Sequence, residues 1–88
     1  MRFQYDPAKA VANLKKHGVS FADAEGVLED PLALTVQDPD SEGEARYITI
    51  GVGSAGELLV VVYSERNDKY RIISARRPTR KELKSYEN

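Results

Sequence analysis

The first third of the chain carries two stretches with helical periodicity. Asp6-Pro7 supplies an N-cap followed by proline at the first helical position, and Gly18 supplies a left-handed C-cap, so we expect a helix between them. A cap at Ser20 and a stop at Pro31 predict a second, shorter helix. The apolar residues that we expect to form the buried stripe of the first helix are Ala8, Val11 and Leu14.

From residue 32 onward the apolar residues alternate, as they do in strands. The predicted strands, joined by short turns, are residues 32–36, 46–52, 57–66 and 69–77. Residues 58–63 lack alternation, which indicates an inner strand buried on both faces. Thr79 and Glu82 form a capping box that opens a C-terminal helix. The order of elements predicts an α+β fold with two N-terminal helices, a four-stranded antiparallel meander sheet and a C-terminal helix.

Length and composition restrict the classes of protein and site. The 88 residues suffice for a single domain, residues 1–88. With no cysteine and one histidine, the chain offers no disulfide, no thiolate zinc site and no imidazole-based metal site, and we expect no cofactor. No segment resembles a signal peptide, and the longest apolar run, residues 58–63, is too short to cross a membrane. We therefore expect a cytoplasmic protein without a membrane partner.

Charge divides the chain into two parts, although the net charge is only −1. Residues 66–84 contain eight Lys and Arg against two Asp and Glu, whereas residues 18–45 contain eight Asp and Glu and no Lys or Arg. The basic part favours an anion-binding surface of the kind that binds nucleic acid. Mutual neutralisation of the two parts across the fold explains the charge counts equally well.

Several motifs resemble the BrnT-type toxins of type II toxin–antitoxin pairs. Those that carry most of the resemblance are Tyr5-Asp6-Pro7, the Lys-His-Gly-Val-Ser-Phe run of residues 16–21, Glu44 with Arg46, Arg66, and the Arg-Ile-Ile-Ser-Ala-Arg run of residues 71–76. The chain departs from the commonest pattern at Tyr5, where tryptophan is frequent, and at Arg77-Pro78, where Lys-Ala is usual. The resemblance implies a RelE-like toxin domain, an endoribonuclease activity that inhibits translation, and a cognate antitoxin that alone contacts operator DNA.

Metal-independent cleavage of RNA needs groups that transfer protons and cations that bind phosphate. His17 is the first candidate for proton transfer, although a histidine at this position could also simply cap the helix C-terminus. Glu44 and Arg46 lie two residues apart on one predicted strand face, where they could act as a second acid–base group beside a phosphate ligand. An ordinary ion pair with a neighbouring strand is the alternative for Glu44.

Three arginines are the strongest candidates for phosphate binding, because a guanidinium stays charged and offers a planar fork. They are Arg66, Arg71 and Arg76, with Lys16 and Arg77 as further substrate-binding candidates. Arg71 and Arg76 are five residues apart, so a regular strand would point them to opposite faces. Either a bulge near Ser74 aligns them, or one is structural and pairs with Glu82 or another acidic residue.

Two functions are compatible with these residues. The first is an endoribonuclease toxin that binds RNA and forms a heterotetramer with its antitoxin, docked on the acidic segment 23–44 or on the basic cleft. The second is a non-catalytic binding or assembly module whose basic sheet face holds an acidic partner. Cleavage of RNA in the presence of a chelator distinguishes the two.

Overall fold

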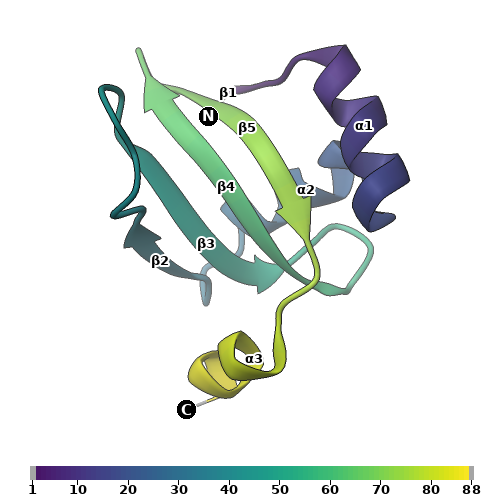
Figure 1. Cartoon of the computed structure of the whole chain (residues 1–88). Coiled ribbons are helices and arrows are strands. Elements are labelled where there is room, and N and C mark those ends of the chain that lie inside the picture. Colours follow the sequence, from purple (N-terminus) through teal and green to yellow (C-terminus); the bar gives the residue numbers. More distant parts are fainter. Residues whose placement is uncertain (1, 88) are drawn as a thin grey trace.

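The computed structural model describes residues 2–87, which form a sheet, two helices packed on it and a third helix beyond its end (Figure 1). In chain order the elements are β1 (Arg2–Gln4), α1 (Pro7–His17), α2 (Phe21–Leu28), β2 (Leu34–Gln37), β3 (Arg46–Val52), β4 (Leu58–Arg66), β5 (Lys69–Arg76) and α3 (Arg80–Glu87). Among these residues no helix is both long enough and apolar enough to span a membrane.

The sheet has five strands in the order β1-β5-β4-β3-β2. Strands β2 to β5 form the expected antiparallel meander, but β1 adds a parallel strand beside β5. The expected RelE-like, four-stranded antiparallel sheet is therefore not matched in detail, because the sheet is five-stranded and mixed. The missed strand has only three residues, and its partner lies at the other end of the chain: Phe3 pairs with Tyr70, and their ring centroids are 6.0 Å apart.

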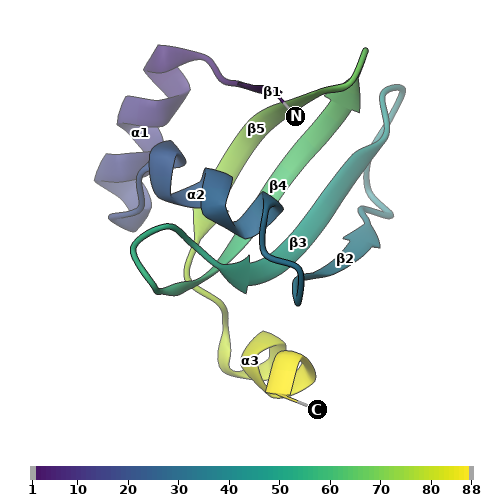
Figure 2. The ribbon, with the colours of Figure 1, turned by 180° about the vertical axis from the view of Figure 1, so that it is seen from behind.

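Helices α1 and α2 cover the same side of the sheet, as the view from behind shows (Figure 2). The core lies between them and β4 and β5, and its buried members are Val19, Phe21, Ala24, Val27, Leu59, Val61, Tyr63, Ile72 and Ala75. The opposite side of the sheet carries no helix and is called the open face below. Helix α3 projects past the end of the sheet near the last residues of β5 (Figures 1 and 2).

The predicted helix ends are confirmed, whereas the predicted buried stripe of α1 is wrong. The Asp6 carboxylate accepts a hydrogen bond from the Ala8 N–H, and Gly18 adopts a φ of 70°. Val11 and Leu14, however, are 56% and 51% exposed. The helix packs on β5 through the side of its one buried residue, the polar Asn13, so these apolar residues face outward.

Candidate functional site

The residues with candidate chemistry gather where α1 meets the open face along β5. A central hollow of about 480 Å³ is lined by Lys9, Asp40, Glu42, Glu44, Arg46, Ser64, Arg71 and Ile73. A neighbouring hollow shares Lys9 and Ile73 and adds Lys16 and His17. A third shares Glu44 and Arg71 and adds Arg66. We call the joined surface the α1–β5 trough; its ionisable members are the basic Lys9, Lys16, His17, Arg46, Arg66 and Arg71 and the acidic Asp40, Glu42 and Glu44.

A β-bulge in β5 decides which arginines face the trough. Ile72 pairs with Tyr63 and Ser74 pairs with Val62, so the intervening Ile73 has no partner on β4. The extra residue shifts the alternation, and Arg71 and Arg76 consequently lie opposite residues four apart on β4, which share one face. Both arginines therefore project to the open face, as expected for a bulge near Ser74.

Asn13 attaches α1 to the part of β5 that β1 does not reach. Its Nδ2 donates to the Ala75 carbonyl at 2.8 Å and to the Val19 carbonyl at 3.0 Å, and its Oδ1 accepts from the Ala75 N–H at 3.1 Å. The side chain thus satisfies both backbone groups of Ala75, as a neighbouring strand would. Asn13 is 7% exposed, and this anchor fixes Lys9, Lys16 and His17 beside β5.

Two of the predicted cations in the trough are paired with carboxylates. Arg66 Nε lies 3.2 Å from Glu44 Oε1, and Arg46 Nη2 lies 3.3 Å from Asp38 Oδ2. Pairing of this kind was the alternative interpretation of Glu44. These pairs hold the two guanidiniums and the Glu44 carboxylate at the trough wall. The pair of Arg66 with Glu44 is exposed enough to rearrange around an anionic ligand, whereas the Asp38 side chain of the other pair is only 13% exposed.

Arg76 and Arg77 line none of the three hollows of the trough. Arg76 forms a bidentate pair with Glu82 of α3, with distances of 2.7 and 2.8 Å, and this pair lowers the pKa of Glu82 to about 2. Arg77 donates to the His17 carbonyl at 3.1 Å and pairs with Glu57 at 3.2 Å. Both arginines therefore hold the fold together in this structure, and their use in substrate binding would require these contacts to open.

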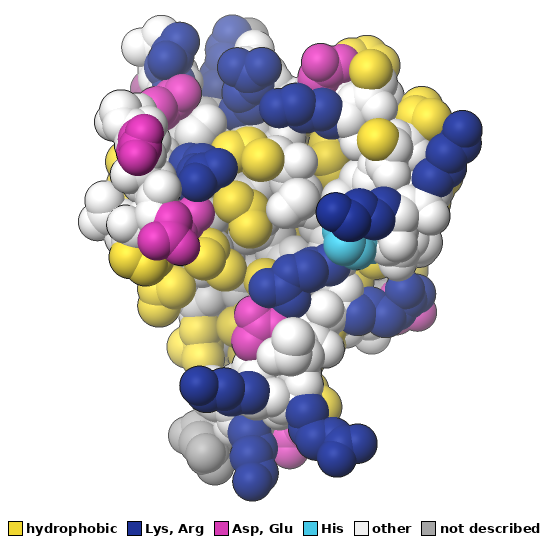
Figure 3. All heavy atoms as spheres, viewed as in Figure 1, with side chains coloured by type: hydrophobic (Ala, Val, Ile, Leu, Met, Phe, Trp, Pro, Cys, Tyr) yellow, Lys and Arg dark blue, Asp and Glu magenta, His cyan; other side chains and the backbone are white. Residues whose placement is uncertain are grey.

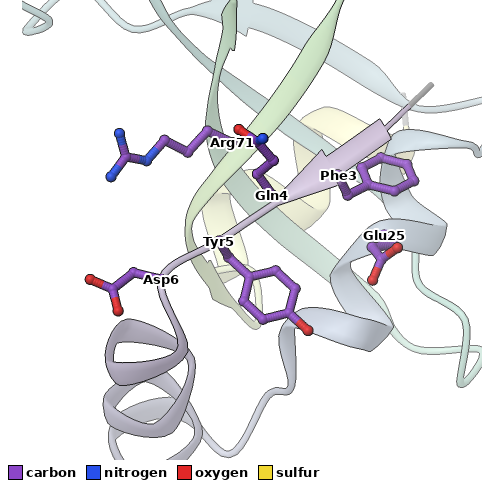
Figure 4. Close-up of a pocket in the computed structure, with 6 residues that line it drawn as sticks. All are labelled: Phe3, Gln4, Tyr5, Asp6, Glu25 and Arg71. Atoms are coloured by element: carbon purple, nitrogen blue, oxygen red, sulfur yellow. The ribbon is translucent and has the colours of Figure 1, made fainter.

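Arg71 differs from the other candidate arginines. Within residues 2–87 it forms no salt bridge, and its side chain is exposed. It also borders a further hollow beside β1, where Arg71 and Asp6 project to one side of the strand and Phe3, Tyr5 and Glu25 to the other (Figure 4). An unpaired guanidinium on an open face is available to an anionic ligand.

His17 is half-buried, and its imidazole forms no hydrogen bond within the described part of the chain. The C-terminus of α1 is capped instead by the Gly18 N–H, which donates to the Leu14 carbonyl, and by Arg77. The capping role considered for the His17 side chain is therefore filled by other groups. On this face the histidine is surrounded by Lys and Arg side chains (Figure 3).

Lys9 is a trough residue that the sequence-based set of candidates omits. It lines two of the three hollows, and helical spacing places it on the same side of α1 as Asn13 and Lys16. The polar stripe formed by these three residues is the signal that could have revealed it. Within residues 2–87, no three His, Asp or Glu side chains come together in an arrangement that could hold a metal ion.

Comparison with known proteins assigns the chain to a family. Residues 5–82 match the family model of the ribonuclease toxin BrnT of type II toxin–antitoxin systems. The chain belongs to the BrnT family. Its structure is similar to the crystal structure of the Brucella abortus ribonuclease toxin BrnT, with a TM-score of 0.66 and 24% sequence identity, covering 91% of this chain and 99% of the Brucella chain. No curated protein sequence matches significantly.

Membership of the BrnT family confirms the resemblance seen in the motifs. A ribonuclease toxin acts on RNA, and a type II system pairs the toxin with a cognate antitoxin protein. The similarity to the Brucella structure supports the α+β fold. In this BrnT chain the trough presents cations, three carboxylates and a histidine together, and phosphodiester cleavage uses groups of these types.

Proposed function

We propose that this BrnT chain is a metal-independent endoribonuclease that binds RNA along the α1–β5 trough. One observation supports the proposal most directly: the imidazole of His17, the carboxylate of Glu44 and the unpaired guanidinium of Arg71 line one joined surface, although they come from separate elements. Each is of a type that phosphodiester cleavage needs.

The proposed reaction is attack of a ribose 2′-oxygen on the adjacent phosphorus. The Glu44 carboxylate takes the proton of the 2′-hydroxyl as the new O–P bond forms, and the bond from phosphorus to the 5′-oxygen breaks. His17 gives a proton to the departing 5′-oxygen. The products are a 2′,3′-cyclic phosphate and a 5′-hydroxyl, so no metal-bound nucleophile is required.

Cations of the trough neutralise the charge that develops on the phosphate. Arg71 is the main phosphate ligand in this proposal because its guanidinium is not committed to a carboxylate. Lys9, Lys16 and Arg46 bind flanking phosphates, and Arg66 holds Glu44 in place. Arg76 and Arg77 contribute indirectly, through α3 and the end of α1.

The biological role proposed for this activity is that of a cytoplasmic toxin of the RelE-like group. Cleavage of RNA inhibits translation, and the cognate antitoxin neutralises the toxin and alone contacts operator DNA. The complex is expected to contain two copies of each chain. Light scattering on the purified pair measures its mass, and a simple 1:1 heterodimer would contradict this stoichiometry.

RNA incubated with the purified chain in excess chelator tests the enzymatic proposal. We expect cleavage by the wild type and a loss of about a hundredfold or more for His17→Ala and for Arg71→Ala. Lys15→Ala, on the same helix but outside the three hollows, is the control and should cleave like the wild type. Full activity of His17→Ala, or cleavage that stops with the chelator, contradicts the mechanism.

A non-catalytic module remains the second candidate, because four of the candidate arginines are paired with carboxylates within the fold. In that case the trough would hold an acidic partner without turning RNA over. Intact RNA after prolonged incubation with a chain that still binds its partner would favour the module.

A further inference from the structure

The open face also carries an apolar surface at the sheet edge away from the trough. Cross-strand pairing places aliphatic side chains of β2, β3 and β4 in two rows, Leu34–Ile50–Val60 and Val36–Ile48–Val62. Val60 is buried, so the accessible part of the rows consists of the other five residues. Leu34 and Val36 are 50% and 61% exposed, and Leu32, just before the strand, is 76% exposed. Apolar side chains gather on this part of the open face in Figure 3. A contiguous exposed patch of this kind marks an interaction surface.

β2 is an edge strand, so one side of its backbone has no strand partner within residues 2–87. The Asp38 N–H donates to the Arg46 carbonyl at 2.8 Å, so the backbone groups of Asp38 point towards β3. This direction alternates along an antiparallel strand, so the backbone groups of Val36 and Leu34 also point towards β3. The N–H and C=O groups of Thr35 and Gln37 consequently point away from β3. We call the exposed residues of β2, its outward backbone groups and the two aliphatic rows the β2 edge surface.

The charges around this surface decide what kind of molecule fits it. β2 itself carries no charged residue, and Asp38, which follows it, pairs with Arg46. Asp40, Glu42 and Glu44 come next and line the central hollow of the trough, so these carboxylates flank the end of β2 that adjoins the trough. The phosphates of RNA would find no cation on β2, whereas the trough offers several. Pairing of β2 with a second copy of the chain would bring two such acidic segments together, at an electrostatic cost.

We propose that the β2 edge surface binds the cognate antitoxin, which adds an extended strand to the sheet. The fitting antitoxin segment has aliphatic side chains at alternate positions and Lys or Arg at its ends. Backbone hydrogen bonds to Thr35 and Gln37 give affinity, while contacts with the aliphatic rows and the flanking carboxylates give specificity. The inference rests on the proposed pairing with an antitoxin. It places the antitoxin contact at β2, on a different part of the molecule from the trough that is proposed to bind RNA.

Hydrogen exchange locates the contact directly. The probe is the antitoxin encoded beside this chain, co-expressed and purified as the complex. The amides of Thr35 and Gln37 should exchange quickly in the free chain and at least about tenfold more slowly in the complex. Protection of trough amides with Thr35 and Gln37 unchanged would overturn the proposal. So would protection of these two amides by RNA, or by raising the concentration of the chain alone.

Two pairs of variants test side chain and backbone separately. Val36→Asp should weaken antitoxin binding at least about tenfold, whereas Val11→Asp, at a similarly exposed valine on α1, should not. Gln37→Pro removes one outward N–H and should weaken binding by a similar factor, whereas Gln37→Ala keeps the N–H and should bind like the wild type. Wild-type affinity of Val36→Asp and Gln37→Pro overturns the proposal.

Ribonuclease activity of the free variants distinguishes this proposal from the proposed function. Val36→Asp and Gln37→Pro should cleave RNA within about twofold of the wild type, since neither residue lines the three hollows of the trough. That result also shows that both variants fold. A wild-type chain that leaves RNA intact but protects Thr35 and Gln37 on antitoxin binding would refute the enzymatic proposal and support the β2 edge surface.

Discussion

The two edges of the sheet differ in almost every physical property. The β5 edge is covered by β1 and α1, which pair with its backbone through residues 2–4 and through Asn13, and it borders the trough, where cations lie beside carboxylates. The β2 edge is open and aliphatic, carries no Lys or Arg, and its outer backbone groups have no strand partner within residues 2–87. In the two proposals made above, a small domain binds a polyanion beside one edge of its sheet and a protein strand at the other.

The comparison also shows how little of the β5 edge depends on hydrophobic burial. Helix α1 exposes Val11 and Leu14 and is attached to β5 through a buried amide. Hydrogen bonds of a buried amide are directional, so they fix the height and rotation of the helix as well as its position. Lys9, Lys16 and His17 depend on that orientation, which makes Asn13 a positioning residue for the trough.

Replacement of Asn13 should produce the largest effect on this arrangement. Asn13→Ala leaves the Ala75 N–H, the Ala75 carbonyl and the Val19 carbonyl without their partner, so we expect the free energy of unfolding to fall by about 3 kcal/mol. Urea denaturation measures the change. The variant should lose RNA cleavage even under conditions in which it is still folded, because α1 would no longer hold Lys9, Lys16 and His17 in place.

The control for Asn13 is Gln37→Ala, which removes an exposed amide from the opposite edge. Its free energy of unfolding should lie within about 0.5 kcal/mol of the wild type. Equal free energies of unfolding for the two variants would show that the Asn13 hydrogen bonds contribute little to stability. The attachment of α1 to β5 would then need another explanation.

The pair between Arg76 and Glu82 should give an intermediate, pH-dependent effect. The pKa of Glu82 is lowered to about 2 by Arg76, so its contribution to stability is present above its ordinary pKa of 4.5 and is lost as the pH falls towards 2. Because both side chains are partly exposed, we expect Glu82→Gln to lower the free energy of unfolding by only about 1 kcal/mol at pH 7. Urea denaturation at pH 7, 4 and 3 should show the difference shrinking.

Glu57→Gln is the matched control, because Glu57 pairs with Arg77 through side chains that are both more exposed. Its effect at pH 7 should be no more than about 0.3 kcal/mol. A difference between Glu82→Gln and the wild type that stays constant from pH 7 to pH 3 would contradict the assignment to the carboxylate charge.

Removal of one trough lysine should give the smallest effect. It tests whether the trough binds RNA through a defined set of phosphate contacts. Lys9→Ala should raise the KM for RNA about threefold to tenfold and reduce the slope of log affinity against log salt by about 0.7, the contribution of one phosphate contact. Lys15→Ala, on the same helix outside the trough, should change neither quantity. Equal effects of the two variants would indicate general attraction without a defined site.

The local features of the fold could be predicted from the sequence because neighbouring residues determine them. The caps at Asp6, Ser20 and Gly18 and the capping box of Thr79 with Glu82 are confirmed by hydrogen bonds or by φ. The short turn expected between the strands of residues 57–66 and 69–77 is confirmed as well: Asn67 and Asp68 form it, both at positive φ. The family could also be predicted, because the motifs that characterise BrnT toxins are spread over most of the chain.

The sequence by itself determined the elements, the meander, the division of charge and the BrnT family, because short-range periodicity, caps and motifs are contained in neighbouring residues. Tertiary structure alone decided that β1 joins β5, that Asn13 rather than an apolar stripe docks α1, and that the unpaired Ile73 aligns Arg71 with Arg76. It also decided that Arg76 forms a salt bridge with Glu82, whereas Arg71 forms no salt bridge within the described residues. These outcomes depend on strand register and on contacts between distant residues, which a linear pattern does not contain.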